Sequence, residues 1–242
     1  MIKSIKKSDL SFFLITFSYW FFMLTDGALR MLVLLHFHTL GFTPLQLAYL
    51  FLLYEFFGMV TNLTAGWIAK KIGLNITLYT GLFLQILSLL LLTQIDKNWS
   101  ITLSVIFVMA TQGLSGIAKD LTKMSSKSSV KLLAPDNNSK LFQWVSFMTG
   151  SKNAVKGFGF LLGSLLLTFI GFKSSLFFMA AFLSITLILV VILLRDKLST
   201  TKKDTKFSEV FSKNKKWTKI NVQIPDFLTL LKIENFHFFF MV

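Results

Sequence analysis

Charged side chains lie within long apolar stretches of this sequence, where they are costly and therefore candidates for function. Asp26 and Arg30 are four residues apart, so they share one face of a helix and can form an ion pair. Alternatively, the guanidinium of Arg30 is well shaped to clamp a phosphate, carboxylate or arsenate. Arg30 and Arg195 are the arginines of this lysine-rich chain, which favours a ligand role for Arg30.

Two lysines, Lys152 and Lys156, lie one helical turn apart in another apolar stretch. Like charges at this spacing repel unless an anion or a carboxylate lies nearby. The pair therefore predicts anion binding or gating, with pairing to Glu55 or Asp120 as the structural alternative. Further along, Gly159 and Gly163 have the GxxxG spacing that permits helices to approach closely.

Lysines also recur at every fourth residue beyond Ala118 and would form a basic stripe if the helix continues there. Lys119 and Lys123 are placed to guide an anion inward, whereas Lys127 and Lys131 are expected to anchor the chain to acidic lipid. Glu55 is either a proton-carrying group or the partner of a lysine. The predicted substrate-binding residues are Arg30, Lys119, Lys152 and Lys156, and those for proton coupling or ion pairing are Asp26, Glu55 and Asp120.

The segments that carry these residues are predicted to span a membrane. The chain has 242 residues, of which 54% are hydrophobic and only 15% charged, against roughly a quarter in soluble domains. Stretches of about 20 apolar residues are long enough to cross a bilayer as helices. The six predicted spans are Ser11–His38, Pro44–Ala69, Ile72–Ile95, Asn98–Ala118, Leu141–Phe172 and Ser174–Leu194. Charges in spans one, two, four and five suggest four helices around a polar cavity, with spans three and six facing lipid.

Basic residues set the expected orientation. They are concentrated in the segments that lie inside if the N-terminus is cytoplasmic, and only Lys97 and Lys173 fall outside. We therefore expect a multi-pass protein of the cell membrane with a cytoplasmic N-terminus.

The net charge of +14 is spread between apolar runs, so nucleic-acid binding is not expected. The absence of Cys excludes cysteine-based metal sites, and we expect no metal or cofactor.

The predicted domain boundary follows Leu194. Residues 1–194 form the six-helix bundle, and residues 195–242 form a basic cytoplasmic linker with an atypical apolar C-terminal segment. Within that segment, Ile224–Val242 contains charged residues and makes a poor seventh span.

The loop between spans two and three resembles a signature of the major facilitator superfamily. The signature runs glycine, three residues, acid, base, any residue and glycine, and here it would comprise Gly66, Lys70, Lys71 and Gly73. Both glycines and Lys71 fit, whereas Lys70 replaces the acid. The resemblance implies that these residues form a gating loop.

Further blocks resemble ArsJ, the organoarsenical efflux branch of this superfamily. They are Leu24–Val33, Tyr54–Asn62, Gly113–Leu121 and Thr149–Ala154. The resemblance implies export of an arsenated phosphoglycerate, which confers arsenate resistance. It also implies a functional link to a glyceraldehyde-3-phosphate dehydrogenase, because this enzyme forms the cargo when it uses arsenate instead of phosphate.

Chain length is the main departure from the family. Major facilitators place the substrate between two six-helix halves, so this sequence corresponds to the N-terminal half. We expect a truncated all-α membrane protein that needs the missing half or a second copy for transport, and we expect the tail from Gln223 onward to lie outside the resemblance. The alternatives are an exporter of another phosphorylated or carboxylated metabolite, and a non-transporting fragment or scaffold. An intramembrane enzyme would need facing carboxylates or a His-Glu motif, which the spans do not offer.

Overall fold

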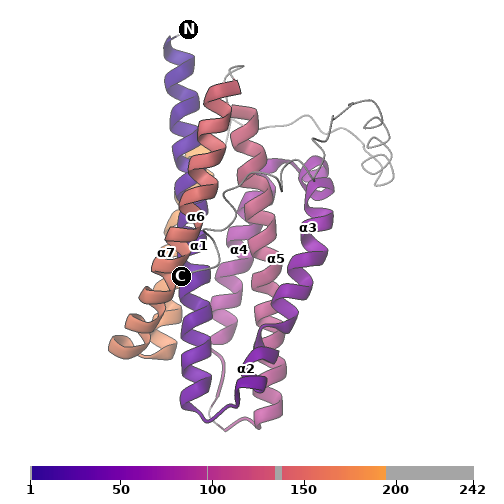
Figure 1. Ribbon diagram of the computed structural model, residues 1–242, viewed down its shortest axis with the longest axis vertical. Coiled ribbons are helices and arrows are strands. Elements are labelled where there is room, and N and C mark those ends of the chain that lie inside the picture. Colours follow the sequence, from indigo (N-terminus) through magenta and orange to yellow (C-terminus); the bar gives the residue numbers. More distant parts are fainter. Residues whose placement is uncertain (1, 97, 134–137, 195–242) are drawn as a thin grey trace, which may run out of the picture. The chain divides into compact units, whose positions relative to one another are not determined.

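The computed structural model describes residues 2–96, 98–133 and 138–194, and this part of the chain is helical throughout, apart from short connections. Predictions for residues 195–242 lie outside the described residues. The helices are α1 (Ile2–Thr39), α2 (Pro44–Leu50), α3 (Leu52–Ile72), α4 (Leu74–Leu92), α5 (Ile101–Leu133), α6 (Asn138–Ile170) and α7 (Phe172–Leu194) (Figure 1).

Six stretches of the described residues are long and apolar enough to cross a membrane, which confirms the predicted number. The second span consists of α2 and α3, which adjoin at Phe51. Its start is fixed by Pro44 in the first turn and by a capping box between Thr43 and Gln46. The all-helical prediction is therefore confirmed.

Helix α5 continues well beyond the predicted end of the fourth span at Ala118, as far as Leu133. The hydropathy of the sequence falls after Ala118 because lysines and serines follow. The helix nevertheless continues, because these serines pack inside the bundle. Ser125, Ser126 and Ser129 are buried against the rest of the bundle. The lysines from Lys119 to Lys131 therefore do lie along one continuous helix.

The helices pack in pairs that bring the charged spans together. Helix α1 lies along α6, while α5 lies between α3 and α4, and α7 packs on α4 (Figure 1). Buried aromatic and aliphatic side chains of α1, among them Tyr19, Phe22 and Leu32, form much of the core. Helices α1, α3, α5 and α6 are therefore held close enough for their polar side chains to meet.

The contact between α1 and α6 depends on glycine. A Cβ atom added to Gly159 would collide with the backbone oxygen of Leu24, and one added to Gly163 would collide with that of Ala28. The two backbones thus approach as closely as the GxxxG spacing predicts.

We expect Gly159→Ala to destabilise the intact protein by about 1–3 kcal/mol, because the added methyl group must push two helix backbones apart. Gly157→Ala is the matched control, since a Cβ at Gly157 meets no atom within 4 Å. Thermal unfolding of both variants in detergent measures the difference. Equal melting temperatures would show that the α1–α6 contact is not close-packed.

Candidate anion-binding site

Asp26 ties three helices together in the interior of the bundle. Its side chain is fully buried, and its Oδ2 lies 2.9 Å from Nζ of Lys156 on α6. The hydroxyl of Tyr54 on α3 donates a hydrogen bond of 2.5 Å to its Oδ1. The carboxylate on α1 is therefore paired with a cation from α6 and accepts a hydrogen bond from a phenol on α3, so its buried charge is compensated.

Glu55, the residue after Tyr54, joins two cations from other helices. Nη2 of Arg30 lies 2.6 Å from its Oε1, and Nζ of Lys119 lies 3.6 Å from its Oε2. The side chain of Glu55 is 62% exposed, whereas those of Arg30 and Lys119 are only 24% and 17% exposed. The carboxylate thus lies on the open side of both cations.

The ring of Tyr54 supports the same two cations. The guanidinium carbon of Arg30 lies 3.9 Å from the ring centroid, and Nζ of Lys119 lies 4.2 Å from it. Both distances are within the range of cation–π attraction. Tyr54 therefore links the Asp26 pair to the Glu55 pair and orients Arg30 and Lys119.

A third carboxylate, Asp120, completes the cluster on α5. It is buried, with Oδ1 lying 3.1 Å from Nζ of Lys123 and Oδ2 lying 3.9 Å from Nζ of Lys119. Gly58 on α3 leaves room for it, because a Cβ there would lie 2.9 Å from Asp120 Oδ2.

Asp26, Glu55 and Asp120 all form ion pairs, but not with the partners that sequence spacing suggests as structural alternatives. Asp26 and Arg30 do not pair along α1, because the neighbouring helices supply a closer partner to each: Lys156 to Asp26 and Glu55 to Arg30. Likewise, Lys156 pairs with Asp26 and not with Glu55 or Asp120. Asp26 thereby also offsets the repulsion expected between Lys156 and Lys152.

Lys152 is not brought into this cluster. It is half-buried on α6 and has no ion-pair partner among the described residues. It lies close enough to Lys127 of α5 for the two ammonium groups to repel each other. Lys152 and Lys127 therefore present uncompensated positive charge next to the cluster.

The cluster itself carries one more cation than carboxylates. Its cations are Arg30, Lys119, Lys123 and Lys156, and its carboxylates are Asp26, Glu55 and Asp120. A surplus of positive charge within low-dielectric walls attracts anions strongly. The arrangement is suited to binding a small anion at the exposed side of Arg30 and Lys119.

Sequence reasoning did not single out Tyr54 as a site residue. Its hydroxyl partner is 28 positions away in sequence and its ring partners lie on two other helices, so no local spacing indicates its role. The available signals are its position in the middle of a span, next to Glu55, and its place in the block Tyr54–Asn62 that resembles the efflux branch.

The predicted gating-loop residues lie apart from the cluster, at the junction of α3 and α4. Gly73 has a φ of +96° and forms the cap between the two helices, a conformation that favours glycine. Nζ of Lys71 lies 5.1 Å from the centroid of the Trp67 ring. Gly66 approaches Met124 of α5, and Lys70 is exposed. The gating role of these four residues stays a prediction.

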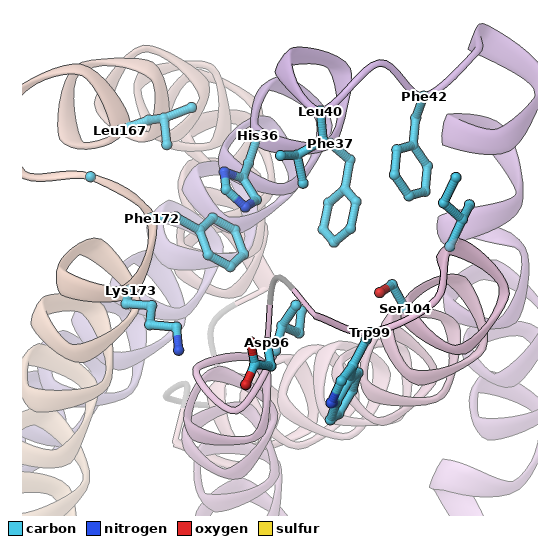
Figure 2. Close-up of a pocket in the computed structure, with 13 residues that line it drawn as sticks. His36, Phe37, Leu40, Phe42, Asp96, Trp99, Ser104, Leu167, Phe172 and Lys173 are labelled. Carbon is cyan, nitrogen blue, oxygen red and sulfur yellow. The ribbon is translucent and has the colours of Figure 1, made fainter.

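A separate cavity of about 660 Å³ lies at the ends of the helices, around the C-terminal end of α1 and the start of α7 (Figure 2). Its walls are mainly apolar and include several aromatic rings, with His36 stacked on Phe172 at a ring-centroid distance of 3.9 Å. Asp96 and Lys173 also line it. None of the predicted substrate-binding residues lines this cavity, so it is distinct from the ion-pair cluster.

Comparison with solved structures shows the same fold in a known transporter. The chain is similar to a structure described as "Crystal structure of peptide transporter POT in complex with sulfate", with a TM-score of 0.68 and 13% sequence identity. The match covers 84% of this chain and 42% of the other, so this chain spans less than half the length of that transporter. No curated protein matches the sequence.

Comparison with protein families gives a match over nearly the whole chain. Residues 12–241 match the Major Facilitator Superfamily. The match includes the segment after Gln223, so the expectation that the resemblance ends there is wrong. Together with the six apolar helices, this match shows that the chain belongs to the Major Facilitator Superfamily.

Proposed function

We propose that this chain forms the N-terminal half of a membrane exporter for an anionic organoarsenical, an arsenated phosphoglycerate, and that it has no enzymatic activity. The observation that carries the proposal is the convergence of Arg30 and Lys119 on one exposed carboxylate. Cations that hold a carboxylate in this way also suit phosphate and arsenate oxygens. The intact transporter would supply the other wall of the site from a second six-helix half or a second copy of this chain.

The distribution of charge supports a substrate with two anionic groups. One group would be bound by Arg30 and Lys119 and the other attracted by Lys152, while Lys156 holds Asp26 in place and contributes positive charge. Glu55, Asp26 and Asp120 are the candidates for proton coupling. The blocks that resemble ArsJ favour an arsenated phosphoglycerate over other phosphorylated or carboxylated metabolites, and a glyceraldehyde-3-phosphate dehydrogenase would supply this cargo.

We place both ends of the bundle in the cytoplasm of a cell whose plasma membrane it spans, following the distribution of lysines. The chain has no Cys, so single cysteines report sidedness directly. In intact cells, a membrane-impermeant maleimide should label Asn98→Cys and spare Lys131→Cys. Labelling only of Lys131→Cys would reverse the orientation.

Arsenate resistance tests the proposed substrate. Arsenate-sensitive cells should gain resistance from the intact transporter only when a glyceraldehyde-3-phosphate dehydrogenase is expressed with it. Resistance without the dehydrogenase would show that the cargo is not its product. Export of phosphoglycerate without any effect on arsenate resistance would favour the alternative, a metabolite exporter.

A further inference from the structure

Glu55 differs from the other two carboxylates of the cluster in its exposure. Its side chain is 62% exposed, whereas those of Asp26 and Asp120 are 0% and 5% exposed. Asp26 is also held by both Tyr54 and Lys156. The side chain of Glu55 therefore has room to move away from Arg30 and Lys119, whereas the other two carboxylates are fixed in the packed interior.

Arg30 and Lys119 do not depend on Glu55 for their positions. The ring of Tyr54 lies against both cations, and its hydroxyl is fixed by the hydrogen bond to Asp26. Lys119 has a second carboxylate, Asp120, at 3.9 Å. If Glu55 moved away, Arg30 and Lys119 would keep their positions. The side of each cation that Glu55 had occupied would then be exposed.

We infer that Glu55 is a displaceable internal anion that occupies the position taken by the substrate's anionic oxygens. This inference rests on the proposed function, because it assigns a role within the same site. A carboxylate makes the same charge-assisted contacts to guanidinium and ammonium groups as a phosphate or arsenate oxygen. The short tether gives Glu55 a high effective concentration, so any external anion must compete with it.

This competition sets a threshold for anion binding. A monoanion such as acetate gains no more from Arg30 and Lys119 than the carboxylate that it must displace. A dianionic phosphate or arsenate carries more charge to the same two cations and therefore displaces Glu55 more readily. Glu55 lowers the apparent affinity for every anion by the same factor, so anions that bind the two cations weakly, such as small monoanions, need much higher concentrations to occupy the site.

The test is the affinity for inorganic phosphate and for acetate, measured by calorimetry at a pH where phosphate is dianionic. The sample is the purified intact transporter, in which this chain is joined by its second six-helix half or a second copy. Glu55→Gln keeps the shape of the side chain and removes its charge. We expect it to bind both anions on the order of tenfold more tightly, by a similar factor for each, because the same internal competitor is removed. Phe56→Gln, at an exposed neighbouring position, is the matched control and should leave both affinities unchanged.

Unchanged or weaker anion binding by folded Glu55→Gln protein would overturn the inference, as would no anion binding by any variant. If Glu55→Gln does not fold, Glu55→Asp decides, since its shorter side chain retracts the carboxylate. Affinity for acetate above the wild-type value then supports the inference, and unchanged or lower affinity overturns it. The proposed substrate fails separately, through the dehydrogenase-dependent resistance, because tighter binding of inorganic phosphate does not require an arsenical cargo.

Discussion

Replacing Asp26 by Asn is expected to lower the free energy of unfolding of the intact protein by about 3 kcal/mol. The substitution leaves the ammonium of Lys156 without its partner at 2.9 Å. It also removes the charged acceptor for the hydroxyl of Tyr54. The contacts that Asp26 makes from α1 to α3 and α6 are therefore weakened together. The expected readouts are a lower melting temperature in detergent and a lower yield of folded protein.

Two further variants test the cause of this loss. Asp26→Asn combined with Lys156→Met removes both charges and should recover part of the stability, because no unpaired ammonium remains. Glu55→Gln is the control for an exposed pair and should cost less than about 1 kcal/mol. If Asp26→Asn were no more destabilising than Glu55→Gln, Asp26 would not be the tie between α1, α3 and α6.

Replacing Arg30 by Ala is expected to reduce transport by the intact protein about 100-fold, the equivalent of losing one hydrogen-bonded charge pair to the substrate. Arg30 lies at the open side of the cluster and is held there by the ring of Tyr54. Arg30→Lys should recover only part of the rate, because an ammonium cannot form the paired contacts of a guanidinium. Uptake of the arsenated substrate by everted membrane vesicles provides the measurement.

The other arginine of the chain, Arg195, supplies the control, since Arg195→Ala removes the same charge at a position after the last predicted span. Its uptake should match that of the wild type. Equal uptake by Arg30→Ala and wild-type vesicles would remove Arg30 from the substrate site.

The elements of this fold were predictable from sequence because the bilayer imposes a length and an apolar composition on each helix. The helices that meet at the cluster were predictable as well, because charges inside a membrane must face one another and not lipid. Spans one, two, four and five contain those charges, and the corresponding helices α1, α3, α5 and α6 are joined by the observed ion pairs.

Individual partners were not predictable, because they depend on how the helices rotate and slide against one another. Asp26 and Arg30 have ideal spacing for a pair along one helix, yet each binds a residue from another helix. The role of Tyr54 was not predictable for the same reason, since its partners lie on other helices. The sequence predicts the end of the fourth apolar span at Ala118 but leaves open whether the helix continues, because hydropathy reports contact with lipid, whereas buried serines extend this helix through packing.

The central claim is that Arg30 and Lys119 form an anion-binding site, and equilibrium binding of 3-phosphoglycerate to the purified intact protein tests it most directly. This compound is a stable analogue of the proposed cargo. We expect saturable binding that weakens as salt concentration rises, and loss of that binding in the double variant Arg30→Ala, Lys119→Ala. Absence of binding to the wild type, or unchanged binding to a folded double variant, would contradict the claim.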